Sequence, residues 1–162
     1  MTKKVAWDID GTLYHNFLEL DFFGYVERFG GRDKILPFNR TNPVVCPQDV
    51  RYVLTFRPSW WREQTEKELL DHGFRPYRVI MNQSATDMHP NESVVFKAGV
   101  LNAEGFDVYV DDDPILRMKL QPLTLARCMS VEEFYNEDIY NALISSSQEK
   151  SDAWAKPWSE LK

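Results

Sequence analysis

Short apolar runs alternate with segments of helical character along most of this chain of 162 residues. Runs of this length bounded by turn residues are typical of buried strands. The predicted strands cover residues 5–9, 50–56, 78–81, 107–110 and 125–129. Strands that alternate with helices predict an α/β fold of three layers with a central parallel sheet of about five strands, similar to a Rossmann fold.

The segment after the second predicted strand carries helix signals at both ends. Ser59 is a residue type that favours the N-cap position, and Gly73 is expected just beyond the last turn. Between them, Trp61, Thr65 and Leu69 recur at helical spacing and so share one face. The sequence therefore predicts an amphipathic helix packed on the sheet.

Three further helices are predicted downstream. Residues 92–102 place apolar side chains on one face. Asp113 followed by proline resembles an N-cap with proline at the first helical position. Ser130 and Glu133 form a capping box for a last helix that runs to about residue 144.

These elements predict one domain over residues 1–144, with an insertion and a tail. Residues 14–48 are rich in aromatics without a clear period, which favours a small hairpin or flap inserted after the first strand. Residues 145–162 form a polar tail in which Trp154 and Trp158 are the apolar exceptions.

Composition narrows the class of protein. A net charge of −6 and an isoelectric point near 5.1 argue against a protein whose main task is to coat nucleic acid. Cys46 and Cys128 match no metal-ligand spacing and are expected to be buried free thiols, with a disulfide as the alternative. No apolar run reaches transmembrane length and no signal segment begins the chain, so we expect a cytoplasmic protein with no membrane partner and no obligate protein partner.

Polar side chains occur where three of the predicted strands end. They are Asp8 and Asp10 after the first strand, Thr55 and Arg57 at the second, and Asp111, Asp112 and Asp113 after the fourth. Lys97 lies near the start of the helix that precedes the fourth strand. Because ligands of parallel sheets bind beyond the carboxyl ends of the strands, these groups are expected to face one site. Several close carboxylates need a cation, and hard oxygen ligands favour Mg²⁺.

The order of these motifs resembles that of the haloacid dehalogenase superfamily. The resemblance spans residues 5 to about 134 and rests on four motifs: Asp8-Ile9-Asp10-Gly11-Thr12, Thr55, Lys97 and the pair Asp111-Asp112. It implies a Mg²⁺-dependent phosphomonoesterase that acts through an aspartyl-phosphate. Asp8 would be the nucleophile, Asp10 the general acid and base, Thr55 and Lys97 the ligands of the phosphoryl oxygens, and Asp8, the Asp10 carbonyl and Asp111 the metal ligands, with Asp112 beside them.

The spacing of the first two carboxylates demands a bend in the chain. Successive side chains of an ideal strand alternate between its faces, and Asp10 is expected to need a change of direction after Ile9 to face the same phosphate as Asp8. Gly11 is the residue that makes such a bend possible, since glycine tolerates unusual backbone angles.

Three features leave alternatives open. Arg57 either clamps a substrate phosphate or pairs with a helix acid, and Phe56 stands where the superfamily often has glycine. Trp60 and Trp61 either stack on a base, or Trp61 belongs to the core and Trp60 is a half-exposed side chain at its surface. The scattered histidines are His15, His72 and His89, and they suggest no metal site.

The gaps between the motifs leave no room for a large cap domain, which predicts an open site. An open site accepts large or terminal phosphates, and the motif order is similar to the 3′-phosphatase domain of polynucleotide kinase-phosphatases. We therefore expect action on nucleotide or nucleic-acid-end (3′) phosphates. The alternatives are a small deoxynucleotidase, a phosphoprotein phosphatase, another reaction on the same scaffold such as a mutase, and a binding module without turnover. No phosphate-loop motif of a kinase occurs.

Overall fold

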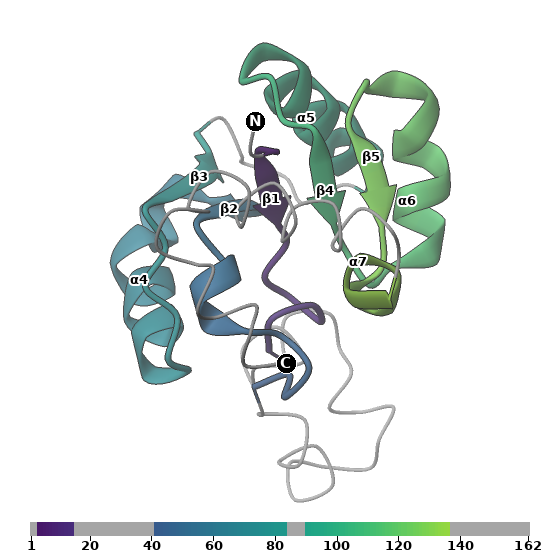
Figure 1. Cartoon of the computed structure of the whole chain (residues 1–162). Coiled ribbons are helices and arrows are strands. Elements are labelled where there is room, and N and C mark those ends of the chain that lie inside the picture. The colour runs from purple at the N-terminus through teal and green to yellow at the C-terminus, as the bar shows by residue number, and fades with distance from the viewer. Residues whose placement is uncertain (1–2, 15–40, 84–89, 137–162) are drawn as a thin grey trace, which may run out of the picture.

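The computed structural model describes residues 3–14, 41–83 and 90–136, in which five strands form one all-parallel sheet (Figure 1). The strands are β1 (Val5–Trp7), β2 (Tyr52–Pro58), β3 (Arg78–Asn82), β4 (Val108–Val110) and β5 (Arg127–Met129), in the order β3-β2-β1-β4-β5. The predicted Rossmann-like α/β fold is confirmed. The strands differ from the prediction mainly at their ends, since β1 stops two residues early and β5 begins two residues late.

Helices cover both faces of the sheet (Figure 1). The α-helices are α4 (Arg62–Asp71), α5 (Pro90–Ala103), α6 (Pro114–Leu120) and α7 (Val131–Asn136), and the short 3₁₀ turns are η2 (Pro47–Asp49), η3 (Ser59–Trp61) and η4 (Gln121–Leu123). Apolar residues of α4 and α7 join one core cluster, and those of α5 and α6 join the other. The sheet is therefore the middle of three layers, as the alternation of strands and helices predicts.

Strand residues alternate between the two cores. In β1, Trp7 belongs to the cluster under α4 and α7, whereas its neighbour Ala6 belongs to the cluster under α5 and α6. In β4, Val110 and Tyr109 divide in the same way. Because both faces of this sheet are covered, the strands are apolar at consecutive positions rather than at every second one.

The helix ends follow the predicted capping with one exception. Gly73 has φ of +86° and ends α4 in a Schellman motif, in which the N–H groups of Gly73 and Phe74 donate to Leu70 and Leu69. Ser59 does not cap α4, because its side chain makes no cap hydrogen bond and the 3₁₀ turn η3 begins there instead. The prediction of Ser59 as N-cap was wrong.

The caps of α6 and α7 are as predicted. Asp113 accepts hydrogen bonds from the N–H groups of Ile115 and Leu116. Ser130 and Glu133 each accept from the other's backbone N–H, which is the reciprocal capping box. The predicted end of this last helix near residue 144 lies outside the described residues.

β2 leaves the regular pairing of the sheet near its carboxyl end. The last regular pair with β3 joins Leu54 to Ile80, and the next pair joins Pro58 to Asn82. Between these two pairs β2 advances by four residues, whereas β3 advances by two. The irregularity in pairing therefore falls on residues 55–57. Both candidate side chains of β2 lie in this displaced segment.

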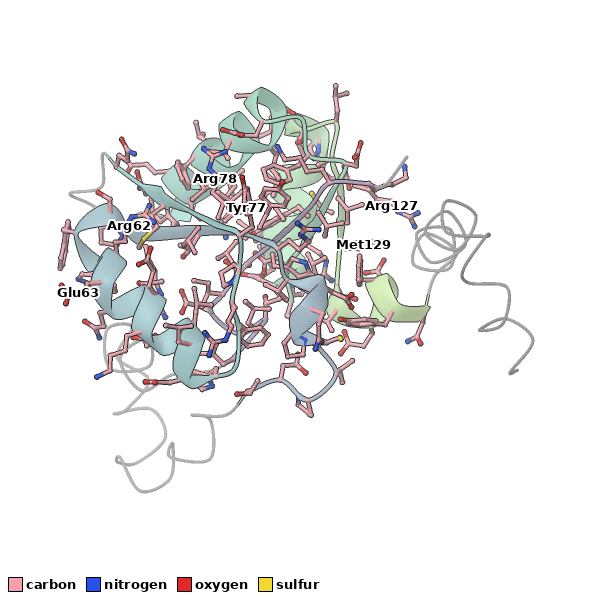
Figure 2. All side chains as sticks on the ribbon, turned by 60° about the vertical axis from the view of Figure 1, so that its left-hand side comes forward. Arg62, Glu63, Tyr77, Arg78, Arg127 and Met129 are labelled. Atoms are coloured by element: carbon pink, nitrogen blue, oxygen red, sulfur yellow. The ribbon has the colours of Figure 1, made fainter. Side chains whose placement is uncertain are left out.

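The two edges of the sheet carry different residues. Arg78 and Arg127 begin β3 and β5 at the amino edge (Figure 2), and both are exposed. At the carboxyl edge, β1 lies between β2 and β4, so the strand order reverses beside β1. This reversal is the topological switch point at which α/β sheets bind ligands.

The predicted insertion and tail fall mostly outside the described residues. Thr41 forms an isolated antiparallel bridge with Tyr14, so the two described ends of the predicted 14–48 insertion lie side by side. Cys46 and Cys128 are free, as expected, but Cys46 is exposed and Cys128 half-buried rather than both being buried. No helix within the described residues is long and apolar enough to cross a membrane.

Candidate active site

Three ionisable side chains meet at the carboxyl ends of β1 and β4. Nζ of Lys97 donates to Oδ1 of Asp8 at 2.9 Å and to Oδ2 of Asp111 at 3.4 Å. The exposed fractions of Asp8, Lys97 and Asp111 are 6%, 3% and 2%, so the contact is buried. The structure thus brings together residues 89 and 14 positions apart in the chain, which the resemblance placed in one site.

Hydroxyl and backbone donors complete this cluster. Oγ1 of Thr12 donates to Oδ2 of Asp8 at 3.3 Å, and the hydroxyl of Tyr109 donates to Oδ2 of Asp111 at 2.8 Å. The N–H of Asp113 donates to the other oxygen of Asp111 at 2.9 Å. These bonds matter because a buried carboxylate is costly unless it is paired and hydrogen-bonded.

The charges of the cluster shift the proton affinities of its members. Burial raises the pKa of Asp8 to about 8, and the Asp111 carboxylate adds to this although Lys97 opposes it. Burial would lower the pKa of Lys97, but Asp8 and Asp111 outweigh it and raise that pKa above its ordinary value. Lys97 therefore stays charged and faces two acidic side chains, of which Asp8 binds its proton more tightly than an ordinary aspartate.

This donor set fits Mg²⁺. Among the described residues, no three His, Cys, Asp or Glu side chains form a metal cluster. Mg²⁺ does not need one, since it is commonly bound by one or two carboxylates and keeps waters and substrate oxygens. Asp8 and Asp111 offer two carboxylates against a single ammonium, and the backbone carbonyl of Asp10 follows on the adjoining turn.

Asp112 is oriented differently from Asp111. Its carboxylate accepts from the N–H of Val131 at the start of α7, and its own N–H donates to Oγ1 of Thr12. Burial raises the pKa of Asp112. The structure therefore directs Asp111 toward Lys97 and uses Asp112 to hold the start of α7.

A tight turn follows Asp8. The N–H groups of Thr12 and Leu13 both donate to the carbonyl of Ile9, and Gly11 has φ of +81°. The change of direction expected after Ile9 is present, and the residue with left-handed backbone is the predicted glycine, which directly follows Asp10.

Asp10 is held by Arg57. Nε of Arg57 lies 3.1 Å from Oδ2 and 3.2 Å from Oδ1 of Asp10, and Nη2 also donates to Oδ1. Arg57 is 5% exposed, whereas the side chain of Asp10 is 25% exposed. The carboxylate thus keeps one side open while a buried guanidinium fixes the other.

Arg57 has a second set of partners on α4. Its Nη1 donates to Oε1 of Glu68 at 2.9 Å and to Oγ1 of Thr65 at 3.3 Å. Burial would lower the pKa of Arg57, but Asp10 and Glu68 raise it. The structure shows Arg57 paired with a helix acid, Glu68, which is one of the two interpretations that the sequence left open.

Thr55 lies in the displaced part of β2. It is 1% exposed, and its Oγ1 accepts from the N–H of Arg57 at 3.1 Å. This bond orients the hydroxyl and stabilises the irregular segment. The hydroxyl hydrogen is left available for a further acceptor.

The aromatic and histidine side chains singled out in the sequence make contacts of their own. Trp60 is 71% exposed just after β2, and Trp61 is half-buried and meets it edge-on at 5.1 Å. His72 stacks on Tyr14 at 4.0 Å and hydrogen-bonds Thr41, so it belongs to a packed contact rather than a metal site. His15 and His89 lie outside the described residues.

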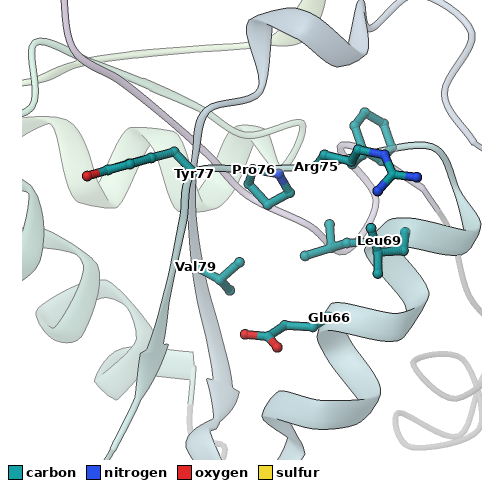
Figure 3. A pocket seen from close by; sticks show the side chains of 8 residues that line it. Glu66, Leu69, Arg75, Pro76, Tyr77 and Val79 are labelled. Carbon is teal, nitrogen blue, oxygen red and sulfur yellow. The ribbon is translucent and has the colours of Figure 1, made fainter.

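A pocket of about 260 Å³ lies elsewhere (Figure 3). Its walls come from the end of α4 and the segment entering β3: Glu66, Leu69, Leu70, Phe74, Arg75, Pro76, Tyr77 and Val79. This places it toward the amino end of β3. It contains none of the candidate site residues.

Sequence reasoning missed two members of the site. Tyr109 precedes Asp111 by two positions, so strand alternation alone could have placed both side chains on one face. Glu68 follows Thr65 by three positions on α4 and therefore lies on a neighbouring part of the helix surface, next to the buried stripe. The sequence left a helix acid open as a partner of Arg57, but nothing in it singled out Glu68.

No family model matches the chain. No curated protein matches it either. Function is therefore inferred from the motif residues and from the geometry that joins them.

Proposed function

We propose that this protein is a Mg²⁺-dependent phosphomonoesterase that resembles the haloacid dehalogenase superfamily and acts through an aspartyl-phosphate. One observation carries the proposal: Asp8 and Asp111 share the buried ammonium of Lys97 at the switch point of the sheet. Asp10 lies in the turn that begins at Ile9, directly before Gly11, and is oriented by Arg57.

In the first half-reaction, a carboxylate oxygen of Asp8 attacks phosphorus. A new bond forms between Asp8 and phosphorus as the bond from phosphorus to the leaving oxygen breaks. Asp10 gives its proton to that oxygen, so the product leaves as an alcohol. The open side of the Asp10 carboxylate is consistent with this exchange.

In the second half-reaction, Asp10 takes a proton from water, which attacks phosphorus. The bond between phosphorus and Asp8 breaks, inorganic phosphate is released, and both aspartates return to their starting state. Lys97 and Thr55 are suited to bind the phosphoryl oxygens as charge develops on them. Mg²⁺ held by Asp8, Asp111 and the Asp10 carbonyl would neutralise phosphate charge near the nucleophile.

The exposed indole of Trp60 favours a substrate with a base. Trp60 is exposed and follows the end of β2, the strand that carries Thr55 and Arg57, by two residues, and an exposed indole is suited to stacking, which is tolerant of base identity. We therefore propose nucleotide or nucleic-acid-end (3′) phosphates as substrates. A small deoxynucleotidase, a phosphoprotein phosphatase and a binding module without turnover are the competing proposals.

The decisive experiment compares the wild type with Asp8→Asn. The substrates are an aryl phosphate, a 3′-phosphorylated oligonucleotide and a free mononucleotide. We expect the wild type to hydrolyse them, with the oligonucleotide preferred. EDTA and Asp8→Asn are each expected to abolish turnover, because the amide cannot form the acyl phosphate.

The matched control is Asp71→Asn, which changes an exposed aspartate at the end of α4 and is expected to keep full activity. Turnover retained by Asp8→Asn would contradict the mechanism. A preference for the mononucleotide would favour the nucleotidase, and wild-type binding of Mg²⁺ and phosphate without turnover would favour the binding module.

A further inference from the structure

Glu68 forms a partly buried ion pair with Arg57, the residue whose guanidinium also holds Asp10. We propose that Glu68 is a positioning residue that fixes the Arg57 guanidinium and, through it, the carboxylate of Asp10. The inference deepens the proposed function and rests on it, because it assigns a role in proton transfer at Asp10.

The geometry around Arg57 supports a relay rather than a phosphate clamp. Nε and Nη2 face Asp10, while Nη1 faces Glu68 and Thr65. A planar guanidinium presents five N–H donors in a rigid fork, so partners at both ends fix its plane. With four of the five donors committed to protein oxygens, Arg57 has little capacity left for a phosphate.

The charge balance around Arg57 is the second reason to assign Glu68 a positioning role. Arg57 carries one positive charge, is 5% exposed, and faces two carboxylates. Asp10 alone would neutralise it, so Glu68 is not needed to compensate the charge. Its effect is to bind Nη1, while Nε and Nη2 bind Asp10, and so to fix the position of the guanidinium plane.

Glu68 is itself held from another direction. The hydroxyl of Tyr14 donates to the same Oε1 atom at 3.2 Å, and the Tyr14 ring is buried. The side chain of Glu68 is 18% exposed. Asp10 is thus connected to α4 and to the end of its own turn by one continuous set of hydrogen bonds.

The test uses the leaving group. An alkyl phosphate such as β-glycerophosphate needs a proton from Asp10, whereas dinitrophenyl phosphate expels a stable anion and needs none. For Glu68→Ala, we expect kcat/KM for β-glycerophosphate to fall about tenfold or more, since a misplaced general acid loses part of its effect. The value for dinitrophenyl phosphate is expected to stay within about twofold of wild type.

Glu68→Gln keeps an oxygen that can accept from Arg57 and is expected to restore much of the loss. Tyr14→Phe removes only the hydroxyl contact and is expected to lower kcat/KM for β-glycerophosphate by a smaller factor. Glu68→Gln and Tyr14→Phe also test the proposal if Glu68→Ala fails to fold. The matched control is Glu63→Ala, an exposed residue of the same helix (Figure 2), which is expected to leave both substrates unaffected.

Equal loss on both substrates would overturn the inference, because a structural or phosphate-binding role has no dependence on the leaving group. Unchanged kinetics in all the Glu68 and Tyr14 variants would overturn it as well. A wild type that hydrolyses neither substrate would overturn the proposed function and this inference with it.

Discussion

At the scale of single residues, the positive charge of Lys97 allows the acidic side chains Asp8 and Asp111 to be buried in one site. Its ammonium is the cation that contacts both Asp8 and Asp111 within the described part of the chain. The tyrosine ring beneath it, Tyr109, lies 5.3 Å from the ammonium and adds a cation–π contact. Substrate phosphate would add further negative charge, so this cation serves both the fold and the proposed chemistry.

Lys97→Met is expected to lower the free energy of unfolding by about 3–5 kcal/mol, because it leaves two buried carboxylates without their partner. It is also expected to abolish turnover. Urea unfolding measures the first effect, with the exposed Lys67→Met on α4 as a control that changes neither. A Lys97→Met protein as stable as wild type would show that the buried cluster does not depend on the ammonium.

The residue types of the site were largely predictable, but their mutual contacts were not. Asp8, Lys97 and Asp111 are expected from the motif order alone, and the structure joins them. Glu68 has no motif, and Arg57 has two plausible partners in the sequence. Which partner it takes depends on where α4 packs, and that is a tertiary property.

At the scale of elements, the ends of helices and strands position the groups. β2 departs from regular pairing at residues 55–57. The hydrogen bond from the Arg57 N–H to Thr55 Oγ1 spans this departure and lets both side chains be buried at one edge. The apolar run of residues is enough to predict the strand. The irregularity arises from how β2 pairs with β3, and this pairing cannot be predicted from a single sequence.

Two glycines give opposite predictions for helix stability. Gly73→Ala is expected to destabilise by about 1–2 kcal/mol, since its φ of +86° is left-handed although space for a Cβ is open. Gly99→Ala, inside α5 and equally unobstructed, is expected to stabilise by about 0.5–1 kcal/mol. Thermal unfolding of the two variants measures the difference, and equal shifts of the same sign would contradict the assigned backbone roles.

At the scale of the whole molecule, topology explains why the site lies where it does. In the order β3-β2-β1-β4-β5, the strands that follow β1 in the chain are added first on one side of β1 and then on the other. The candidate site lies at the carboxyl end of β1, where this reversal occurs. The alternation of strands and helices was sufficient to predict the parallel sheet. The order of its strands was not predictable from that alternation, since it depends on which side of β1 each crossover packs.

The same placement links stability to pH and Mg²⁺. Folding raises the pKa of Asp8 to about 8 through burial and the Asp111 carboxylate, so the folded state holds that proton more tightly than the unfolded state. This contribution to stability is complete below about pH 4 and is lost as the pH rises through about 8. A cation bound by Asp8 under the proposed function must displace the proton, and its apparent affinity weakens about tenfold for each pH unit below about 8.

Thermal unfolding with and without Mg²⁺ measures this linkage. With Mg²⁺ at about 100 times its dissociation constant near pH 8, we expect a gain of about 2.7 kcal/mol, or roughly 5–10 °C in Tm for a domain of this size. At the same concentration near pH 6, proton competition should reduce the gain to below about 1 kcal/mol. Asp8→Asn should show no such gain at either pH, whereas Asp71→Asn should match wild type. A gain that is independent of pH, or one that survives in Asp8→Asn, would place the cation away from Asp8 and separate Mg²⁺ binding from the proposed nucleophile.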